Sequence, residues 1–352
     1  MPHIAAVSKI DLPHKIEQQK VKEYAKNIFS TDFPQIDRII DAFDHTEIKF
    51  RNFCQSLDYY AEGKNFQIHN DEYVRISLEY SIQAVEKSMK LAKVNKNEIT
   101  DFIFISSTGL ATPSLDALII NKMQLNPHIS RTPVFGLGCG GGVSGIAKAN
   151  AIAKGNPEAV VLIVAVELCS LTFLKNDYSK SNFIASSLFS DGIVACIIKG
   201  DSHPFIHPVK IIGSSSKLYY DSLDIMGWEF LDTGFKAIFS KDIPTFIHTN
   251  IRKDIDDFLS KYNLMLGDIK NFIFHPGGKK VINAYEEVLE MKENALKNTC
   301  HIMNEYGNMS SATVLYVLEK FLTDGFENGY GLMVAMGPGF SSEMVLLDMN
   351  KN

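Results

Sequence analysis

The chain has 352 residues, of which 45% are hydrophobic and 22% are charged, and its formal net charge is −6 at pH 7. This composition is typical of a globular protein that is long enough to form two cores, and the negative charge argues against a nucleic-acid-binding surface. The longest aliphatic run, residues 159–166, is far shorter than the roughly 20 residues that a membrane span needs, and the N-terminus does not resemble a secretory signal.

The hydrophobic pattern predicts helices that alternate with buried strands. Helical periodicity extends over residues 73–94. Continuous apolar runs of the buried-strand type occur at residues 102–105, 159–166, 193–198, 272–274, 331–335 and 344–347. Helical segments separate several of these runs, which is typical of an α/β fold with a largely buried sheet.

One segment of the chain recurs in its second part. Residues 97–105 and residues 267–275 both place the pattern Ile-x-x-Phe-Ile-Phe after a helix and a short acidic turn. The two copies lie 170 residues apart, which is close to half of the chain. We therefore expect two structurally related halves, residues 1–215 and residues 216–352.

Cys139 lies at the junction of an apolar run and a glycine-rich helix start. Residues 133–137 are strand-like, glycines flank the cysteine, and a helix of small residues begins at Val143. Unpaired N–H groups and the positive end of the helix dipole stabilise a thiolate there, and the glycines let a substrate carbonyl approach the sulfur. Cys139 is therefore a candidate nucleophile, although a lone buried cysteine is often only a small hydrophobic residue.

The same glycines permit a second interpretation. Gly136, Gly138 and Gly141 match the G-x-G-x-x-G pattern of dinucleotide-binding proteins, which would make the protein an NAD-binding oxidoreductase. The candidate ribose-binding acid, Glu167, follows Gly141 by 26 residues, whereas the pattern expects about 20. Nucleotide binding also leaves Cys139 without a role.

Two further loops supply partners for a nucleophilic cysteine, which needs a base and a group that polarises the substrate carbonyl. His275 ends a second-half strand and precedes Pro-Gly-Gly and a helix, at a sheet edge of the kind where α/β proteins bind ligands. Asn308 lies in the loop Tyr306-Gly-Asn-Met-Ser310, before another helix. It is either a donor to an oxyanion or a helix N-cap, a role that a neighbouring serine fills equally well.

A third loop, Gly337-Pro338-Gly339, follows an apolar run and is either a tight turn or the floor of a cavity. Together with Cys139, His275-Pro-Gly-Gly and the loop that ends at Ser310, it resembles the motif set of the type III polyketide synthases, the chalcone-synthase-like branch of the thiolase superfamily. The order and spacing of the four motifs agree, and the resemblance covers nearly the whole chain.

The resemblance implies a fold and a chemistry. The fold is a five-layered αβαβα arrangement of two pseudo-symmetric halves in a homodimer, and the substrates are acyl-CoA and malonyl-CoA, with no metal or bound cofactor. Cys139 would carry the acyl group as a thioester, its pKa lowered by an ion pair with His275. His275 and Asn308 would hold the malonyl thioester oxygen while CO₂ leaves, because fixed donors stabilise the enolate.

The resemblance also implies residues that shape the substrate cavity. Phe189 matches an aromatic gatekeeper between the CoA tunnel and the cavity, and Ala237 stands where the family has a second gatekeeper phenylalanine. Because a smaller side chain enlarges the cavity, we expect a long-chain fatty acyl-CoA starter and an alkylpyrone or alkylresorcinol product. The remaining expected substrate contacts are Arg38 (at the CoA phosphates), Thr108, Thr112, Cys169, Ser310, Gly337, Pro338 and Gly339.

A 3-ketoacyl-ACP synthase of the initiating type (III) is the nearest alternative enzyme, because it shares the cysteine, the histidine and the asparagine. Its histidine is not usually followed by Pro-Gly-Gly, and it lacks the Gly-Pro-Gly loop. The five cysteines show no disulfide or metal-binding spacing, which favours free thiols in the cytoplasm.

Overall fold

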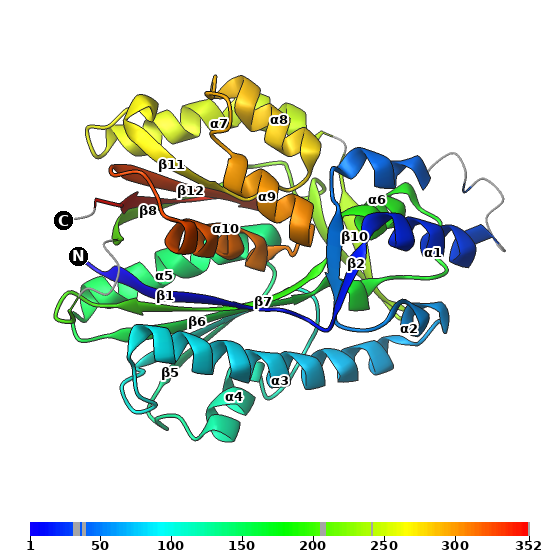
Figure 1. Cartoon of the computed structure of the whole chain (residues 1–352), viewed down its shortest axis with the longest axis horizontal. Coiled ribbons are helices and arrows are strands. Elements are labelled where there is room, and N and C mark those ends of the chain that lie inside the picture. Colours follow the sequence, from blue (N-terminus) through cyan, green and yellow to red (C-terminus); the bar gives the residue numbers. More distant parts are fainter. Residues whose placement is uncertain (31–35, 37–39, 205–208, 241, 351–352) are drawn as a thin grey trace.

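The computed structural model describes residues 1–30, 36, 40–204, 209–240 and 242–350. Nine strands are joined in one order, but the neighbours β1 and β8 pair only at His3 and Lys210, so the strands form two stacked sheets. A helical layer lies between the two sheets and a further helical layer covers each outer face (Figure 1). The order of layers is therefore αβαβα, and the fold class expected from the sequence is confirmed.

The two sheets repeat one pattern of strands. From the centre outward, the first sheet contains β1 (His3–Ile10), β7 (Asp191–Lys199), β6 (Val160–Leu168), β4 (Asp101–Ile105) and β5 (Ser130–Val134). The second sheet contains β8 (Lys210–Leu218), β13 (Ser341–Asp348), β12 (Tyr330–Gly337) and β11 (Ile269–Phe274). In each sheet the first two strand pairs are antiparallel and the third is parallel. β4 and β11, which end the repeated sequence, occupy equivalent places, so the two halves are pseudo-symmetric.

The boundary between the halves differs from the predicted one. A division at residues 215/216 falls inside β8, where this strand pairs with β13. The chain leaves the first sheet when β7 ends at Lys199 and enters the second when β8 begins at Lys210. The sequence hides this because β8 contains Gly-Ser-Ser-Ser and is largely exposed toward its end, so it has the composition of a linker.

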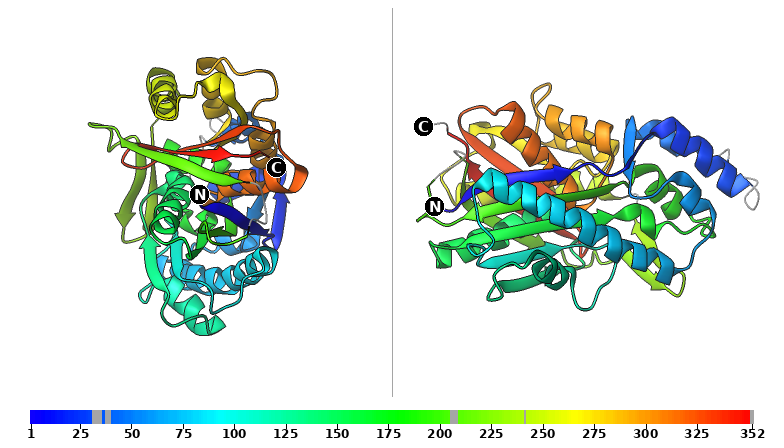
Figure 2. Two further views of the ribbon diagram at one scale, coloured as in Figure 1. Left: turned by 90° about the vertical axis from the view of Figure 1, so that its left-hand side faces the viewer. Right: turned by 60° about the horizontal axis from the view of Figure 1, so that its bottom comes forward.

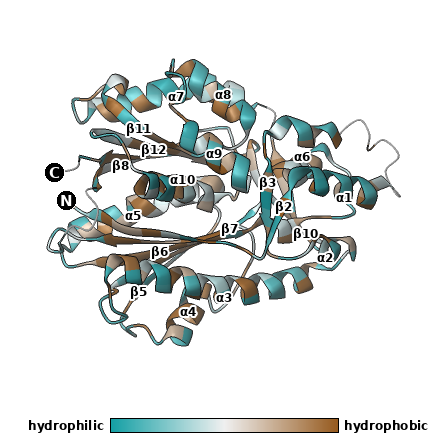
Figure 3. Ribbon diagram, in the orientation of Figure 1, coloured by the Kyte–Doolittle hydropathy of each residue, from teal (hydrophilic) through white to brown (hydrophobic). Residues whose placement is uncertain are grey.

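The helices cover both faces of each sheet. The outer layer on the first sheet is α3 (Phe66–Ala92) and α4 (Leu115–Met123), and the outer layer on the second is α7 (Ile243–Ser260) and α8 (Lys279–Val288). The middle layer contains α5 (Gly141–Gly155) and α10 (Ser311–Asp324), and α9 (Lys297–Tyr306) leads into α10. Hydrophobic residues, brown in Figure 3, are frequent along the strands.

β6 shows why the strands are apolar throughout. All nine of its residues are buried. Val160 and Leu162 belong to the outer core that α3 covers, whereas Val161 and Ile163 belong to the middle core with α5 and α10. Because side chains alternate between the two faces and both faces are covered, a continuous hydrophobic run is required.

The remaining elements gather mainly at the end of the molecule that lies opposite the two termini (Figures 1 and 2). They are α1 (Gln18–Ser30), α2 (Leu57–Ala61), α6 (Lys180–Leu188), the strand pairs β2 (His14–Glu17) with β3 (Phe50–Phe53) and β9 (Met226–Leu231) with β10 (Gly234–Phe239), and the short helices η2 (Ile40–Thr46), η3 (Gly138–Gly140), η4 (Cys169–Thr172) and η5 (Leu266–Asp268). No helix within the described ranges has the length and apolar character to cross a membrane.

Candidate active site

Cys139 lies between the edge strand β5 and the middle-layer helix α5. It is the central residue of η3 and is 4% exposed. Gly138 has a φ of 44°, and a Cβ at this position would lie 2.7 Å from Pro338 Cδ. The Gly138 N–H donates to Ser107 Oγ at 3.1 Å. Glycine is therefore needed for the turn that presents the Cys139 thiol.

His275 follows β11, the outermost strand of the second sheet. Its backbone N–H donates to Val334 O at 2.8 Å, which extends the pairing of β11 with β12 by one residue. The imidazole is buried, and neither ring nitrogen has a hydrogen-bond partner among the described residues. Since buried polar groups are nearly always hydrogen-bonded, both nitrogens are available to a substrate.

Asn308 lies in the turn between α9 and α10 and is fully buried. Its backbone N–H donates to Leu188 O at 3.0 Å, and its carbonyl accepts from the Ser190 N–H at 2.8 Å. These two bonds flank Phe189 and form an isolated β-bridge between Phe189 and Asn308. The backbone of the carboxamide residue is thereby fixed to a segment of the first half.

Cys139, His275 and Asn308 line one cavity of about 340 Å³. The Asn308 Nδ2 donates to Gly277 O at 3.3 Å, and its Oδ1 accepts from the Ser310 N–H, so the amide orientation is fixed with its NH₂ group toward the loop after His275. The other side chains of this wall are Tyr285 and the apolar residues Met226, Phe239, Ile243, Ile247, Val281, Met336 and Phe340. The structure thus brings the three candidate catalytic residues together from the two halves.

Burial dominates the electrostatics of this site. Burial raises the pKa of the Cys139 thiol to about 12, although hydrogen bonds from Ser310 and Asn308 act in the opposite direction. Burial also lowers the pKa of the His275 imidazole to about 3. Burial therefore favours a neutral thiol and a neutral imidazole over the expected ion pair. The N–H groups and the dipole at the start of the helix do not compensate for the hydration that an almost completely buried thiolate loses.

Two family models match nearly the whole chain. The model described as chalcone and stilbene synthases, N-terminal domain, matches residues 14–202, and its C-terminal counterpart matches residues 215–350. The chain belongs to the chalcone and stilbene synthases. It is therefore a type III polyketide synthase, an acyltransferase that condenses malonyl-CoA, and it uses no cofactor beyond its CoA thioester substrates.

Relatives and solved structures agree with this family. The "Putative chalcone synthase" of Bacillus subtilis (strain 168) is 40% identical over 351 residues, which cover 96% of each chain. The 1,3,6,8-tetrahydroxynaphthalene synthase of Streptomyces peucetius subsp. caesius is 32% identical, with coverage of 98% of this chain and 92% of the relative. The crystal structure of the synthase of that name from Streptomyces coelicolor A3(2), a bacterial type III polyketide synthase, matches with a TM-score of 0.93 at 26% identity, with coverage of 99% of this chain and 100% of that chain.

The alternative of an NAD-binding oxidoreductase is wrong. Gly138 is the glycine of that pattern that lets a pyrophosphate approach the backbone, but a Cβ there would lie 2.7 Å from Pro338 Cδ, so the loop around Pro338 occupies this place. The carboxylate of Glu167 accepts from Ser311 Oγ at 2.5 Å and from the Ser107 N–H at 3.0 Å, and is therefore internal to the protein. The family match also decides against the alternative that the protein is a 3-ketoacyl-ACP synthase.

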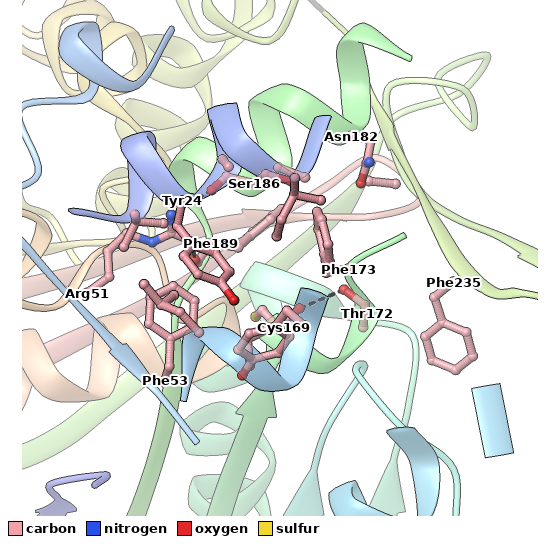
Figure 4. Close-up of a pocket in the computed structure, with 18 of the residues that line it drawn as sticks. Tyr24, Arg51, Phe53, Cys169, Thr172, Phe173, Asn182, Ser186, Phe189 and Phe235 are labelled. Atoms are coloured by element: carbon pink, nitrogen blue, oxygen red, sulfur yellow. Dashed lines mark hydrogen bonds between the residues drawn. The ribbon is translucent and has the colours of Figure 1, made fainter. Parts of the chain in front are cut away.

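Two more cavities extend the active site of this type III polyketide synthase. The first, of about 370 Å³, lies beside Cys139, and several predicted substrate contacts line it: Cys169, Phe189, Ala237, Ser310 and Pro338. The second, of about 670 Å³, shares Cys169, Phe189, Trp228 and Ala237 with the first and continues to α1 and α6. Figure 4 shows Phe53, Phe173 and Phe189 around this second cavity, with Arg51 and Tyr24 also in its wall.

The other predicted contacts lie elsewhere. Thr112 is exposed in the loop after β4 and lines none of the cavities described above. Thr108 lines a separate cavity of about 300 Å³, and its Oγ1 accepts from the Leu168 N–H at 2.9 Å. Gly337 and Gly339 support the loop around Pro338 without lining the cavities themselves. Arg38 lies outside the described residues.

Two residues of the cavity walls were not predicted. Phe239 lies two residues after Ala237 on β10, and its ring packs edge-on against Phe189 with 5.6 Å between centroids. Part of the space that Ala237 opens is therefore filled by Phe239, which period-2 alternation along a strand could have indicated. Arg51 is buried, and its guanidinium donates to Phe189 O and, at 2.5 Å, to Ser186 O. It therefore holds the backbone at Phe189 in place.

Glu167→Gln is expected to make Cys139 more reactive above pH 7. Burial raises the pKa of the Glu167 carboxyl to about 7, so the group acquires its charge as the pH rises through this value, and that charge raises the pKa of the Cys139 thiol. Without the charge, the thiolate fraction increases, and the rate of alkylation of Cys139 by iodoacetamide should rise by about 3-fold or more. Mass spectrometry of the alkylated peptide measures this. Equal rates in variant and wild type from pH 6 to 9 would contradict the coupling.

Proposed function

We propose that this type III polyketide synthase loads a long-chain fatty acyl-CoA starter on Cys139, extends it with malonyl-CoA, and cyclises the product to an alkylpyrone or alkylresorcinol. The observation that carries the proposal is the largely apolar wall of the cavity that adjoins the Cys139 cavity. Aromatic and aliphatic side chains from α1, α6 and β10 line it, and such a wall favours a hydrocarbon chain over a polar one.

Acyl loading starts from a neutral Cys139 thiol and a neutral His275 imidazole. As the Cys139 sulfur attacks the starter carbonyl, its proton passes to His275, and the bond between the carbonyl carbon and the CoA sulfur breaks. The departing CoA thiolate takes the proton from His275. A neutral imidazole is the protonation state that this step needs, and a substrate that stabilises the imidazolium makes His275 a stronger base.

Extension uses the fixed donors. The bond between the malonyl carboxylate and its neighbouring carbon breaks, CO₂ leaves, and the electron pair moves to the thioester oxygen held by His275 and Asn308. The enolate carbon then attacks the acyl-Cys139 carbonyl, and the sulfur leaves. Asn308 is suited to this role because bonds at its backbone and at its Oδ1 keep its NH₂ group in one orientation.

Ala237→Phe is expected to shorten the starter chain that the enzyme accepts. Ala237 is buried and borders both cavities next to Cys169 and Phe189, so a phenyl ring there occupies the route from Cys139 to the larger cavity. Turnover of a C16 acyl-CoA should fall by about 10-fold or more, since the chain must displace the ring, whereas a C4 starter should be unaffected. Competition between the two starters measures this, and an unchanged ratio of products would contradict the proposed route.

The function itself is tested with purified protein, malonyl-CoA and a series of acyl-CoA starters of increasing length, with products identified by mass spectrometry. Alkylpyrones or alkylresorcinols from starters of C12 and longer are the expected result. A product formed from malonyl-CoA alone, whatever starter is added, would refute the proposed starter class while leaving the family intact.

We infer a homodimer that forms at the β5 edge. β5 is the outermost strand of the first sheet and is largely exposed, and it is followed by Phe135, whose side chain is 47% exposed. An unpaired edge next to an exposed aromatic residue favours association with a second copy. A cytoplasmic location is supported by the five cysteines, which are all free thiols.

A further inference from the structure

The cavity that contains Cys139, His275 and Asn308 has one more polar side chain, Tyr285. It lies on α8, the helix that begins four residues after His275. Its ring packs edge-on against Phe274, with 5.1 Å between centroids, and the residue is 1% exposed. The position of the side chain is thereby fixed by packing.

The hydroxyl of Tyr285 makes no hydrogen bond to the residues that the structure describes, and its electrostatic interactions are with Cys139 and Tyr219. The Tyr285 oxygen is not one of the completely buried polar atoms that lack a partner, so it borders the cavity, where a substrate group can accept a hydrogen bond from it. Burial raises the pKa of this phenol, so the hydroxyl keeps its proton and remains a donor at any working pH.

The substrate brings a limited set of acceptors into this cavity. In the proposed function, which this inference presupposes, His275 and Asn308 bind the thioester oxygen of malonyl-CoA. Its carboxylate is the second polar group of the malonyl unit. Apart from these residues and Cys139, the side chains that line the cavity are apolar, so Tyr285 is the donor left for the carboxylate.

We propose that Tyr285 binds the carboxylate of the malonyl unit and so selects malonyl-CoA over thioesters that lack this group. A single neutral donor in an apolar wall orients the carboxylate without stabilising it strongly. The bond to the carboxylate carbon can therefore still break, with CO₂ leaving and the electron pair moving to the thioester oxygen. Tyr285 is a substrate-binding residue in this assignment and does not take part in proton transfer.

Tyr285→Phe separates this role from a structural one, because it removes the hydroxyl and keeps the ring against Phe274. The KM for malonyl-CoA should rise by about 10- to 100-fold, the range expected for a lost hydrogen bond to a charged group. The kcat for decarboxylation should not fall, because the carboxylate becomes less stabilised. The KM for the starter acyl-CoA and the inhibition constant of acetyl-CoA, which has no carboxylate, should be unchanged.

Tyr316→Phe is the matched control. Tyr316 is a buried tyrosine on α10 whose hydroxyl donates to Ile10 O and Ile193 O, outside the cavity. Its loss should lower the melting temperature without raising the KM for malonyl-CoA.

Three results would overturn the assignment of Tyr285. The first is an unchanged KM for malonyl-CoA, and the second is a lower kcat at constant KM, which would place the hydroxyl at the thioester oxygen. The third is an equal rise in the KM for malonyl-CoA and in the inhibition constant of acetyl-CoA. A wild-type protein that decarboxylates no malonyl-CoA would instead refute the proposed function and this assignment with it.

Discussion

Cys139→Ala is expected to abolish the formation of every elongated product and to retain part of the decarboxylation of malonyl-CoA. The acyl group has no comparable attachment point, because Cys139 is the only cysteine, serine or threonine that shares this cavity with His275 and Asn308 among the described residues. Removal of a covalent nucleophile should lower product formation by at least about 10³-fold. Decarboxylation depends on the two donors instead, and both remain. Parallel assays of CO₂ release and of polyketide product measure the two activities.

Cys300→Ala provides the control for this experiment. Cys300 lies on α9, is only partly buried, and lines none of the cavities next to Cys139. Its loss should leave both activities at the wild-type level. Elongated product from the Cys139 variant would show that another residue carries the acyl group and would remove the basis of the mechanism.

His275→Ala is expected to lower the rate of decarboxylation by about 10²- to 10³-fold, the usual effect of removing one donor to a developing oxyanion. The substitution leaves no protein group unpaired, because neither ring nitrogen has a partner among the described residues. The loss should therefore appear in kcat with a smaller change in stability. Steady-state CO₂ release, with the fraction of folded protein verified by circular dichroism, measures it.

The same variant should differ from the wild type in the pH dependence of its stability. Burial lowers the pKa of His275 from 6.5 to about 3, so between these values the unfolded chain binds the proton that the folded protein excludes. The wild type should thus lose stability as the pH falls below 6.5, by about 2 kcal/mol at pH 5, and the variant should lack this contribution. Urea unfolding at pH 7 and pH 5 tests this, and parallel changes in the two proteins would contradict a buried neutral imidazole.

The layers of the fold could be predicted because its strands are covered on both faces. Runs such as residues 159–166 are apolar at every position, and the repeated segments at 97–105 and 267–275 occupy equivalent strands. Cys139, His275 and Asn308 were identifiable because each lies in a glycine-containing loop next to a helix or strand end. Such positions converge at one sheet edge whatever the details of packing.

The remaining features depend on contacts that local sequence does not encode. A tyrosine on an amphipathic helix has the appearance of a core residue, so Tyr285 gave no signal until its ring was placed against Phe274. The protonation of Cys139 follows from its depth of burial, which a helix-dipole argument does not include. Thr112 was predicted to line the cavity from its position in the sequence near Thr108. That position does not determine the course of the loop, and the side chain is exposed.

In the proposed function, the β-bridge between Phe189 and Asn308 links the size of the accepted chain to the speed of the reaction. Because Arg51 also holds Phe189 by its carbonyl, an insertion or deletion in this segment would displace the donor to the enolate together with the aromatic ring. Evolution or engineering of new products in this protein is therefore restricted to side-chain replacements on an unchanged backbone. Ala237 and Phe239 lie on the neighbouring hairpin and form no such bridge. They are therefore the positions where side-chain replacement is least restricted.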